Sequence, residues 1–223
     1  WAFSKTKENL AAVIKRMDEK GFSSLTYCPE TMGKINQIGD LKEIIELCNI
    51  DERILPTIDF GHLHTRGLGA INSRQDFEDI VTELKDKIGG ERTRKKHVHF
   101  SKIAYTKMGE RAHVTFDDEG FGPDFSLLAP VLVKYALEPR ILCESKDTMA
   151  KDAVTMKKMG VDVTFVDPDC SEEELNAAFK DNTKAVFGES IANPALTVLD
   201  IEKFAKAAHA HHVPLIVDNT FPT

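Results

Sequence analysis

The feature that most constrains this chain is an alternation of strand-like and helix-like segments along its whole length. Apolar residues recur at helical spacing in segments such as 75–87 and 148–159, and short strand-like runs, such as 54–59 and 97–101, stand between them. Strand-like runs are followed by helical ones, an order typical of the right-handed βαβ units that build parallel sheets. The sequence therefore predicts an α/β protein.

The same periodicity gives the bounds of the expected elements. The expected helices are residues 6–20, 40–48 (with Asp40 as N-cap), 75–87, 125–136, 148–159, 172–179 and 200–212. The expected strands are residues 25–27, 54–59, 97–101, 140–143, 161–166, 184–187 and 214–217. Seven strands come close to the eight of a closed barrel without reaching that number.

Composition and charge exclude several classes of protein. The apolar runs are far shorter than the roughly 20 residues that a membrane span needs. The net charge of −7 repels phosphate, so a nucleic acid would have to meet a local basic patch. Residues 92–96 (RTRKK) are such a patch, although a solvated loop is the commoner explanation. Four cysteines without short spacing and no signal peptide predict a reducing cytoplasm.

Acidic and imidazole side chains follow four successive strands of the first part of the chain. They are Glu30, Asp59 with His62, His99, and Glu144. Because the carboxyl ends of parallel strands meet at one edge of a sheet, we expect these side chains to converge. Imidazole and carboxylate ligands suit zinc or manganese, although one such residue alone is more often structural. His113 lies where it could join them, and His97 is a candidate for a position behind the ligands.

Four motifs of this region resemble a known family in their order and spacing. Residues 29–34 (PETMGK), 57–62 (TIDFGH), 98–102 (VHFSK) and 142–145 (LCES) are similar to the second part of the endonuclease IV-like apurinic/apyrimidinic endonucleases, TIM barrels of the xylose isomerase-like superfamily. The resemblance covers residues 1–158 and implies a multinuclear zinc site. Its ligands would be Glu30, Asp59, His62, His99, His113 and Glu144.

This resemblance also implies a substrate and a mechanism. The substrate would be DNA with abasic sites, and zinc-bound hydroxide would hydrolyse the adjacent phosphodiester. Glu144 would hold the nucleophilic water and Glu30 would bridge two ions. The chain departs from the family in two places. The family's first strands, with two further histidine ligands, have no counterpart here, and Arg111 stands where the family has the carboxylate of an Asp-x-His pair. Glu110 is a candidate replacement that is out of register by one position.

From residue 160 the motifs change. Residues 161–167 (VDVTFVD), 187–194 (FGESIANP) and 213–220 (VPLIVDNT) resemble the middle of the fold-type I, pyridoxal-phosphate-dependent enzymes of Cys/Met metabolism, and O-acetylhomoserine sulfhydrylases most of all. The resemblance implies that Asp218 pairs with the pyridinium nitrogen of the cofactor and that Asn193 lies near the ring hydroxyl. The family's phosphate-binding glycine turn and Schiff-base lysine lie outside the resembling segment.

Together these patterns predict a partial TIM barrel of βα repeats over residues 1–158, joined to a fragment of a pyridoxal-phosphate fold-type I α/β domain over residues 159–223. The leading functional prediction is a zinc-dependent, endonuclease IV-like hydrolase that is truncated and weak or inactive. The alternatives are a segment of a pyridoxal-phosphate-dependent sulfhydrylase or transsulfuration-type enzyme, and a catalytically silent chimera. An unpaired strand edge favours self-association, and no membrane partner is expected.

Overall fold

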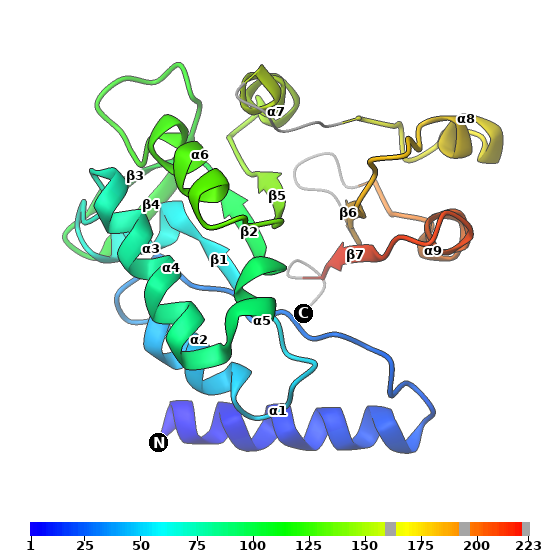
Figure 1. Cartoon of the computed structure of the whole chain (residues 1–223), viewed down its shortest axis with the longest axis horizontal. Coiled ribbons are helices and arrows are strands. Elements are labelled where there is room, and N and C mark those ends of the chain that lie inside the picture. Colours follow the sequence, from blue (N-terminus) through cyan, green and yellow to red (C-terminus); the bar gives the residue numbers. More distant parts are fainter. Residues whose placement is uncertain (159–163, 192–196, 220–223) are drawn as a thin grey trace. The chain divides into compact units, whose positions relative to one another are not determined.

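The computed structural model describes residues 1–158, 164–191 and 197–219, and the chain divides into two compact units, Trp1–Val161 and Asp162–Thr223 (Figure 1). The helices of the first unit are α1 (Ala2–Glu19), α2 (Leu41–Cys48), α3 (Phe60–Arg66), α4 (Arg74–Ile88), α5 (Gly90–Arg94), α6 (Phe125–Lys134) and α7 (Met149–Lys158). Its strands are β1 (Thr57–Asp59), β2 (His97–Phe100), β3 (Lys102–Thr106), β4 (Gly109–Val114) and β5 (Arg140–Cys143). The second unit contains α8 (Glu172–Ala177), β6 (Val186–Glu189), α9 (Ile201–Ala210) and β7 (Leu215–Asp218).

A parallel sheet with the order β1-β2-β5 forms the centre of the first unit, as far as the structure describes it. The segment around residues 27–30 extends this sheet through parallel bridges from Tyr27 to Ile54 and from Glu30 to Thr57. The four strand segments therefore lie side by side in sequence order, as the alternation predicts. One consequence is that their carboxyl ends share one edge, where Asp59 and His99 are partners in register.

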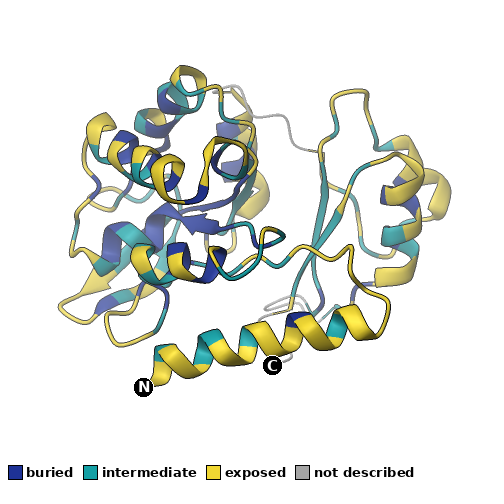
Figure 2. Cartoon of the chain, turned by 60° about the horizontal axis from the view of Figure 1, so that its bottom comes forward, coloured by how far each residue is buried: buried dark blue, intermediate teal, exposed yellow. Residues whose placement is uncertain are grey.

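Burial differs strongly between the strands of this sheet. Every residue of β1 and β2 is buried, whereas β5 is half-buried along its length (Figure 2). Strands buried on both faces are typical of parallel sheets covered by helices. Phe60, the first residue of α3, packs edge-on against Phe77 of α4, and Phe100 of β2 packs in the same way against Phe125 of α6, with ring centroids 5.0 Å apart in each pair. The first contact joins α4 to α3, which directly follows β1, and the second holds α6 against the sheet.

Local sequence signals explain where the principal helices begin. Asp40 accepts a 2.8 Å hydrogen bond from the Glu43 N–H, and the Glu43 carboxylate accepts one of 3.0 Å from the Asp40 N–H. This capping box starts α2, so the predicted N-cap is confirmed. Ser73 and Asp76 form the same arrangement at the start of α4.

The β3–β4 hairpin is an element that the strand-helix alternation does not predict. It is antiparallel, and its register shifts between Ala104 and Tyr105. Ala104 pairs with Ala112 and Tyr105 pairs with Glu110, so Arg111 is an extra residue on β4. This is a β-bulge, which locally changes the face to which the following side chains point.

In the second unit, β6 and β7 are parallel neighbours, α9 contacts β7, and α8 packs against α9. The core there consists of Leu175, Leu199, Phe204 and Ala207, with Val186, Leu215 and Val217 packed against it. The strand expected over residues 161–166 is not formed by residues 164–166, and residues 161–163 lie outside the described part. The predicted parallel α/β architecture is confirmed in both units. The three-stranded sheet described for the first unit is open, so a TIM barrel is not shown.

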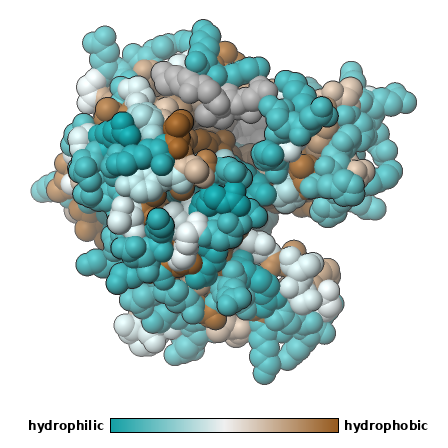
Figure 3. All heavy atoms as spheres, in the orientation of Figure 1, coloured by the Kyte–Doolittle hydropathy of each residue, from teal (hydrophilic) through white to brown (hydrophobic). Residues whose placement is uncertain are grey.

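The described helices include none that is long and apolar enough to cross a membrane. The face of the molecule drawn in Figure 3 is mostly hydrophilic, with apolar residues in small groups.

Candidate functional site

Four of the predicted ligands come together at the carboxyl edge of the sheet in the first unit. Asp59 ends β1, His99 lies in β2, Glu144 follows β5, and Glu30 follows the segment that pairs with β1. The Nδ1 of His99 lies 3.0 Å from Oε1 of Glu30 and 3.1 Å from Oε1 of Glu144. One potential ligand atom from each of the four residues lies within 4.8 Å of the others. We call these four residues the sheet cluster.

A second group of ligands lies beside the sheet cluster. It consists of His62 in α3 and of Glu110 and His113 in β4, and we call it the hairpin cluster. Nε2 of His62 is 3.5 Å from Oε2 of Glu110, and Oε1 of Glu110 is 3.9 Å from Nε2 of His113. The two clusters meet at His62, whose Nδ1 is 3.4 Å from Oε1 of Glu30. The structure thus separates the predicted ligands into two groups and adds Glu110 to them.

Hydrogen bonds from neighbouring groups orient the two histidines of the hairpin cluster. Nδ1 of His62 lies 2.8 Å from the carbonyl oxygen of Thr31, which can only accept, so this nitrogen carries the proton and Nε2 can offer a lone pair. Nδ1 of His113 is 2.7 Å from Oγ of Ser101, which leaves its Nε2 toward Glu110. Such contacts behind the ligands fix ring orientation in metal sites.

Asp59 is the most deeply buried carboxylate of the site. Its Oδ1 accepts a 2.7 Å hydrogen bond from the backbone N–H of His62, at the start of α3. Its Oδ2 is buried and has no hydrogen-bond partner in the described part of the chain. A buried carboxylate oxygen without a hydrogen bond is unfavourable, and a bound cation would compensate it.

The charges of the site are strongly coupled. Burial disfavours the charged rings, but Asp59 and Glu30 outweigh it and raise the pKa of His62 to about 10. The pKa of His99 is likewise well above its ordinary value, because its hydrogen bonds to Glu144 and Glu30 outweigh burial. Burial also opposes ionisation of Glu30, yet the hydrogen bonds from both histidines hold its pKa below the usual range. Without a metal, protons on the imidazoles therefore balance part of the negative charge.

Two further histidines of the first unit, His97 and His64, differ in their surroundings. His97 packs edge-on against His99, with ring centroids 5.2 Å apart. Burial, and then the neighbouring His99, lower the pKa of His97 to about 3, so its ring is neutral. Nδ1 of His64 instead lies 2.9 Å from the carbonyl oxygen of Ile71, in a structural contact within the loop after α3.

The basic residues 92–96 do not form an open phosphate-binding patch. Arg92 donates to the carbonyl oxygens of Ile88 and Cys48, at 2.9 and 2.7 Å. Arg94 and Lys95 both pair with Glu91, and Lys96 is fully buried. The local positive charge is therefore largely used within the fold.

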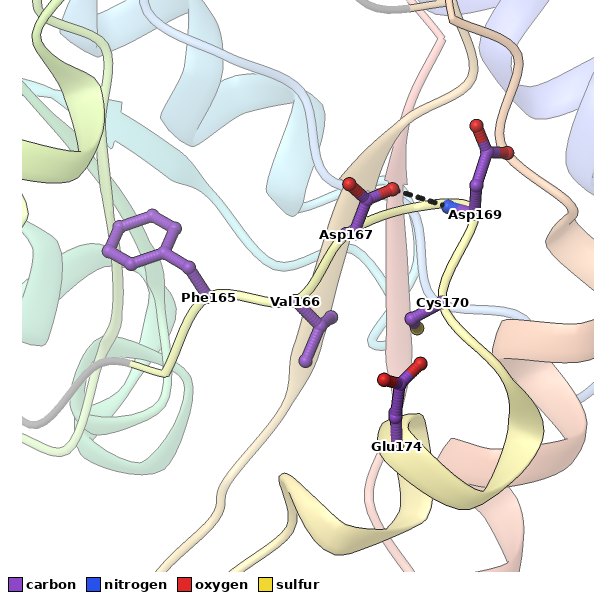
Figure 4. Close-up of a pocket in the computed structure, with 6 residues that line it drawn as sticks. All are labelled: Phe165, Val166, Asp167, Asp169, Cys170 and Glu174. Carbon is purple, nitrogen blue, oxygen red and sulfur yellow. Dashed lines mark hydrogen bonds between the residues drawn. The ribbon is translucent and has the colours of Figure 1, made fainter.

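In the second unit, an open pocket of about 560 Å³ lies at the loop before α8 (Figure 4). Its lining residues are Phe165, Val166, Asp167, Asp169, Cys170 and Glu174. The backbone N–H of Asp169 donates a 2.8 Å hydrogen bond to Oδ1 of Asp167, which shapes the loop. Three of the six lining residues are acidic and none is basic, so the pocket disfavours a phosphate group.

Of the two predicted cofactor-binding residues, Asp218 is described and Asn193 lies outside the described residues. Asp218 ends β7 and is the register partner of Glu189 at the end of β6. Its carbonyl oxygen accepts hydrogen bonds from the backbone N–H and from Oγ of Ser190, at 2.8 and 3.1 Å. Asp218 therefore stands at the carboxyl edge of the parallel pair, where α/β sheets bind ligands.

Comparisons with known proteins match parts of this chain. A family model for Cys/Met metabolism PLP-dependent enzymes matches residues 146–223. An O-acetyl-L-homoserine sulfhydrylase from Corynebacterium glutamicum is 49% identical over 70 residues, which are 31% of this chain and 16% of that protein. An L-methionine gamma-lyase from Fusobacterium nucleatum is 46% identical over 69 residues, 30% of this chain and 17% of that protein. An uncharacterized protein of Methanocaldococcus jannaschii is 30% identical over 156 residues, 70% of this chain and 55% of that protein.

These findings correct the leading functional prediction. The prediction of an abasic-site endonuclease is wrong, because the family model that matches is the one for Cys/Met metabolism PLP-dependent enzymes, and the similar proteins include an O-acetyl-L-homoserine sulfhydrylase and an L-methionine gamma-lyase. The resemblance misled because strand-end carboxylates and histidines occur on many α/β proteins and do not by themselves define a substrate. The chain spans about half the length, or less, of these relatives. Its C-terminal third is similar to Cys/Met metabolism PLP-dependent enzymes.

Proposed function

We propose that residues 146–223 act as a segment of a pyridoxal-phosphate-dependent enzyme of cysteine and methionine metabolism, in which Asp218 pairs with the pyridinium nitrogen. The family match over this segment carries the proposal, and the place of Asp218 at the carboxyl end of β7 supports it. When bound, the cofactor supplies an electron sink, and a carboxylate opposite the ring nitrogen strengthens it.

The residues present do not make a complete cofactor site. Glu189 lies beside Asp218 in register, and the pocket of the second unit is lined by acidic groups, so neither place favours a phosphate. By the resemblance, the phosphate-binding turn and the Schiff-base lysine belong to parts of the family fold outside this segment. The proposed role is therefore limited to the contact that Asp218 makes, and no reaction step is assigned to this chain alone.

A segment exchange tests this role. Residues 164–219 would replace the matching segment of the Corynebacterium glutamicum O-acetyl-L-homoserine sulfhydrylase, with the rest of that enzyme unchanged. We expect the hybrid to keep a stoichiometric visible cofactor band, and Asp218→Ala in the hybrid to weaken it. Asp181→Ala, at an exposed position of the same segment, is the matched control. A folded hybrid whose cofactor band does not respond to Asp218→Ala would contradict the proposal.

We also propose that the first unit binds a divalent transition metal ion at the sheet cluster. The observation that favours this second function is the convergence of Glu30, Asp59, His99 and Glu144 within 4.8 Å. Two ligands on one tetrahedral zinc, each about 2.0–2.2 Å from the ion, lie roughly 3.3 Å apart. The distances of 3.0 and 3.1 Å around Nδ1 of His99 are close to that separation. The buried Oδ2 of Asp59 supplies a further acceptor that a cation would satisfy.

The mixed imidazole and carboxylate ligands suit zinc or manganese. The four strand segments that carry them lie in sequence order, so a partial barrel remains our proposal for the arrangement of this unit.

The test of metal binding is the metal content of the full chain after dialysis with zinc and removal of the excess. We expect bound zinc in the wild type and weaker binding in Glu30→Gln, with the exposed Glu52→Gln as control. A wild-type chain that retains no zinc would refute the proposal.

A further inference from the structure

We infer that Thr31 is a positioning residue for the metal site, because its hydroxyl takes the place of its own carbonyl group in the sheet and releases that carbonyl to hold His62. This inference rests on the metal-binding function proposed above. Thr31 directly follows the proposed ligand Glu30 and is fully buried beside Asp59. The sequence pattern selects carboxylates and imidazoles, so it passes over this hydroxyl.

The segment that ends at Thr31 pairs with β1 as a regular parallel strand up to this residue. The N–H of Thr57 donates to the carbonyl oxygen of Pro29 at 2.9 Å, and the N–H of Thr31 donates to the carbonyl oxygen of Thr57 at 3.1 Å. The hydrogen bonds of a parallel ladder are evenly spaced, so the next one would run from the N–H of Asp59 to the carbonyl oxygen of Thr31. The N–H of Asp59 instead donates to Oγ1 of Thr31, at 2.9 Å.

The hydroxyl of Thr31 replaces both ladder hydrogen bonds of Asp59. Besides accepting from the N–H, Oγ1 of Thr31 donates to the carbonyl oxygen of Asp59 at 3.3 Å. A regular strand would supply this second hydrogen bond from the N–H two residues after Thr31. The chain instead turns away, and the N–H of Met32 donates to the carbonyl oxygen of Gly39 at 2.8 Å. A side chain therefore holds the backbone of Asp59, the member of the sheet cluster at the end of β1.

This exchange leaves the carbonyl oxygen of Thr31 available to His62. In a regular ladder this carbonyl group would point at the N–H of Asp59, in the plane of the sheet. It accepts instead from Nδ1 of His62, at 2.8 Å, and the His62 side chain is only 7% exposed. With the proton on Nδ1, Nε2 keeps its lone pair for a metal ion.

Thr31 thereby acts on both groups of potential ligands. It holds Asp59 of the sheet cluster through its hydroxyl and His62 of the hairpin cluster through its carbonyl oxygen. Valine has the shape of threonine without the hydroxyl, so Thr31→Val should return the carbonyl oxygen to the N–H of Asp59 and loosen the imidazole. Loss of an outer contact of this kind typically weakens metal binding by about 10–100-fold.

The experiment measures the zinc affinity of the full chain by competition with a chromophoric chelator. We expect Thr31→Val to weaken the tightest zinc by at least roughly tenfold. Thr31→Ser, which keeps the hydroxyl, should bind nearly as the wild type does. Thr93→Val is the matched control, because Thr93 is also buried and its hydroxyl donates at 2.9 Å to the carbonyl oxygen of Gly89, before the amino end of β2. This control should keep the wild-type affinity.

Nitrogen NMR of the zinc-loaded chain gives a readout that a general loss of stability would not move. We expect the wild type to carry a proton on Nδ1 of His62 that exchanges slowly with water. Its exchange should be faster in Thr31→Val and unchanged in Thr93→Val. Circular dichroism checks that each variant is folded. If Thr31→Val is not, Thr31→Ala replaces it, and the wild-type spectrum still tests the position of the proton.

The outcomes separate this inference from the function on which it rests. A wild type that binds no zinc refutes metal binding, and the role of Thr31 with it. If the wild type binds zinc and Thr31→Val binds it equally tightly, the role of Thr31 is overturned while metal binding stands. A zinc-loaded wild type with the His62 proton on Nε2 overturns the role of Thr31 as well.

Discussion

The carboxylate of Asp152 in α7 accepts a 2.9 Å hydrogen bond from the backbone N–H of Phe116, in the loop after β4. The same oxygen accepts a second one of 2.9 Å from Oγ of Thr148, and Asp152 is only 1% exposed. α7 also buries Ala153 and Met156 and contacts β5. α7 therefore packs within the first unit, although it lies inside the segment that the pyridoxal-phosphate family model matches.

Replacing Asp152 by alanine should destabilise the first unit. The change leaves the Phe116 N–H without its acceptor, and loss of a buried hydrogen-bond partner costs about 1–3 kcal/mol. We expect a correspondingly lower midpoint of urea unfolding, measured by circular dichroism. Asp86→Ala, on the exposed face of α4, should change the unfolding free energy by less than about 0.5 kcal/mol. Equal midpoints for Asp152→Ala and the wild type would contradict this role.

We predict that Lys96 makes the stability of the first unit depend on pH in the alkaline range. Its side chain is fully buried, its Nζ donates to the Thr93 carbonyl oxygen at 3.1 Å, and burial lowers its pKa from 10.5 to about 8. Between these two values the unfolded chain binds more protons than the folded one, so this group makes stability rise from pH 8 to pH 10.5. Below pH 8 the buried charge destabilises the fold.

Lys96→Met should remove that dependence and raise the unfolding free energy at pH 7 by about 3 kcal/mol, the free-energy equivalent of the pKa difference between 10.5 and about 8. Urea unfolding of the variant and the wild type at pH 7 and pH 10 measures both effects. Lys95→Met, at the exposed neighbouring position, is the control and should follow the wild type at both pH values. The prediction is wrong if Lys96→Met is less stable than the wild type at pH 7.

Zinc should stabilise the first unit and leave the second unit unchanged, because both clusters lie in residues 30–144. At a free zinc concentration 100 times the dissociation constant, one bound ion adds about 2.7 kcal/mol to the unfolding free energy. We expect calorimetry to show a higher melting temperature in the presence of zinc, and we expect a chelator to reverse this increase. His62→Ala should reduce the shift most, since His62 touches both clusters, whereas the exposed His209→Ala should not.

Pyridoxal phosphate added to this chain should not form a stoichiometric internal aldimine. Asp218 offers a carboxylate to the ring nitrogen, but the segment lacks the family's phosphate turn and Schiff-base lysine, so any cofactor should attach to surface lysines. The absorbance in the visible aldimine band is measured after removal of the excess. A stoichiometric band that Asp218→Ala abolishes, while Asp181→Ala retains it, would contradict this expectation.

The sequence predicts the central sheet well, because the order of its strands follows from hydrophobic periodicity alone. The convergence of Glu30, Asp59, His99 and Glu144 follows in turn, since the carboxyl ends of neighbouring parallel strands share an edge. The β3–β4 hairpin is missed, because β4 (GERAHV) contains three polar residues, buries only Gly109 and carries little apolar alternation. The sequence also does not reveal the partners of the basic residues 92–96. Arg94 pairs with Glu91, and Arg92 donates to the carbonyl oxygen of Cys48, which tertiary packing brings close.

Arg111 shows why a pattern of fixed spacing can miss side chains that lie together in the fold. A pattern counts positions along the chain, whereas an ion meets only those side chains that share a face. An inserted residue at a β-bulge changes the spacing along the chain but keeps the flanking side chains on the same face. The same three ligands can therefore be encoded with two spacings, so a carboxylate missing from its usual position can have moved by one residue rather than been lost.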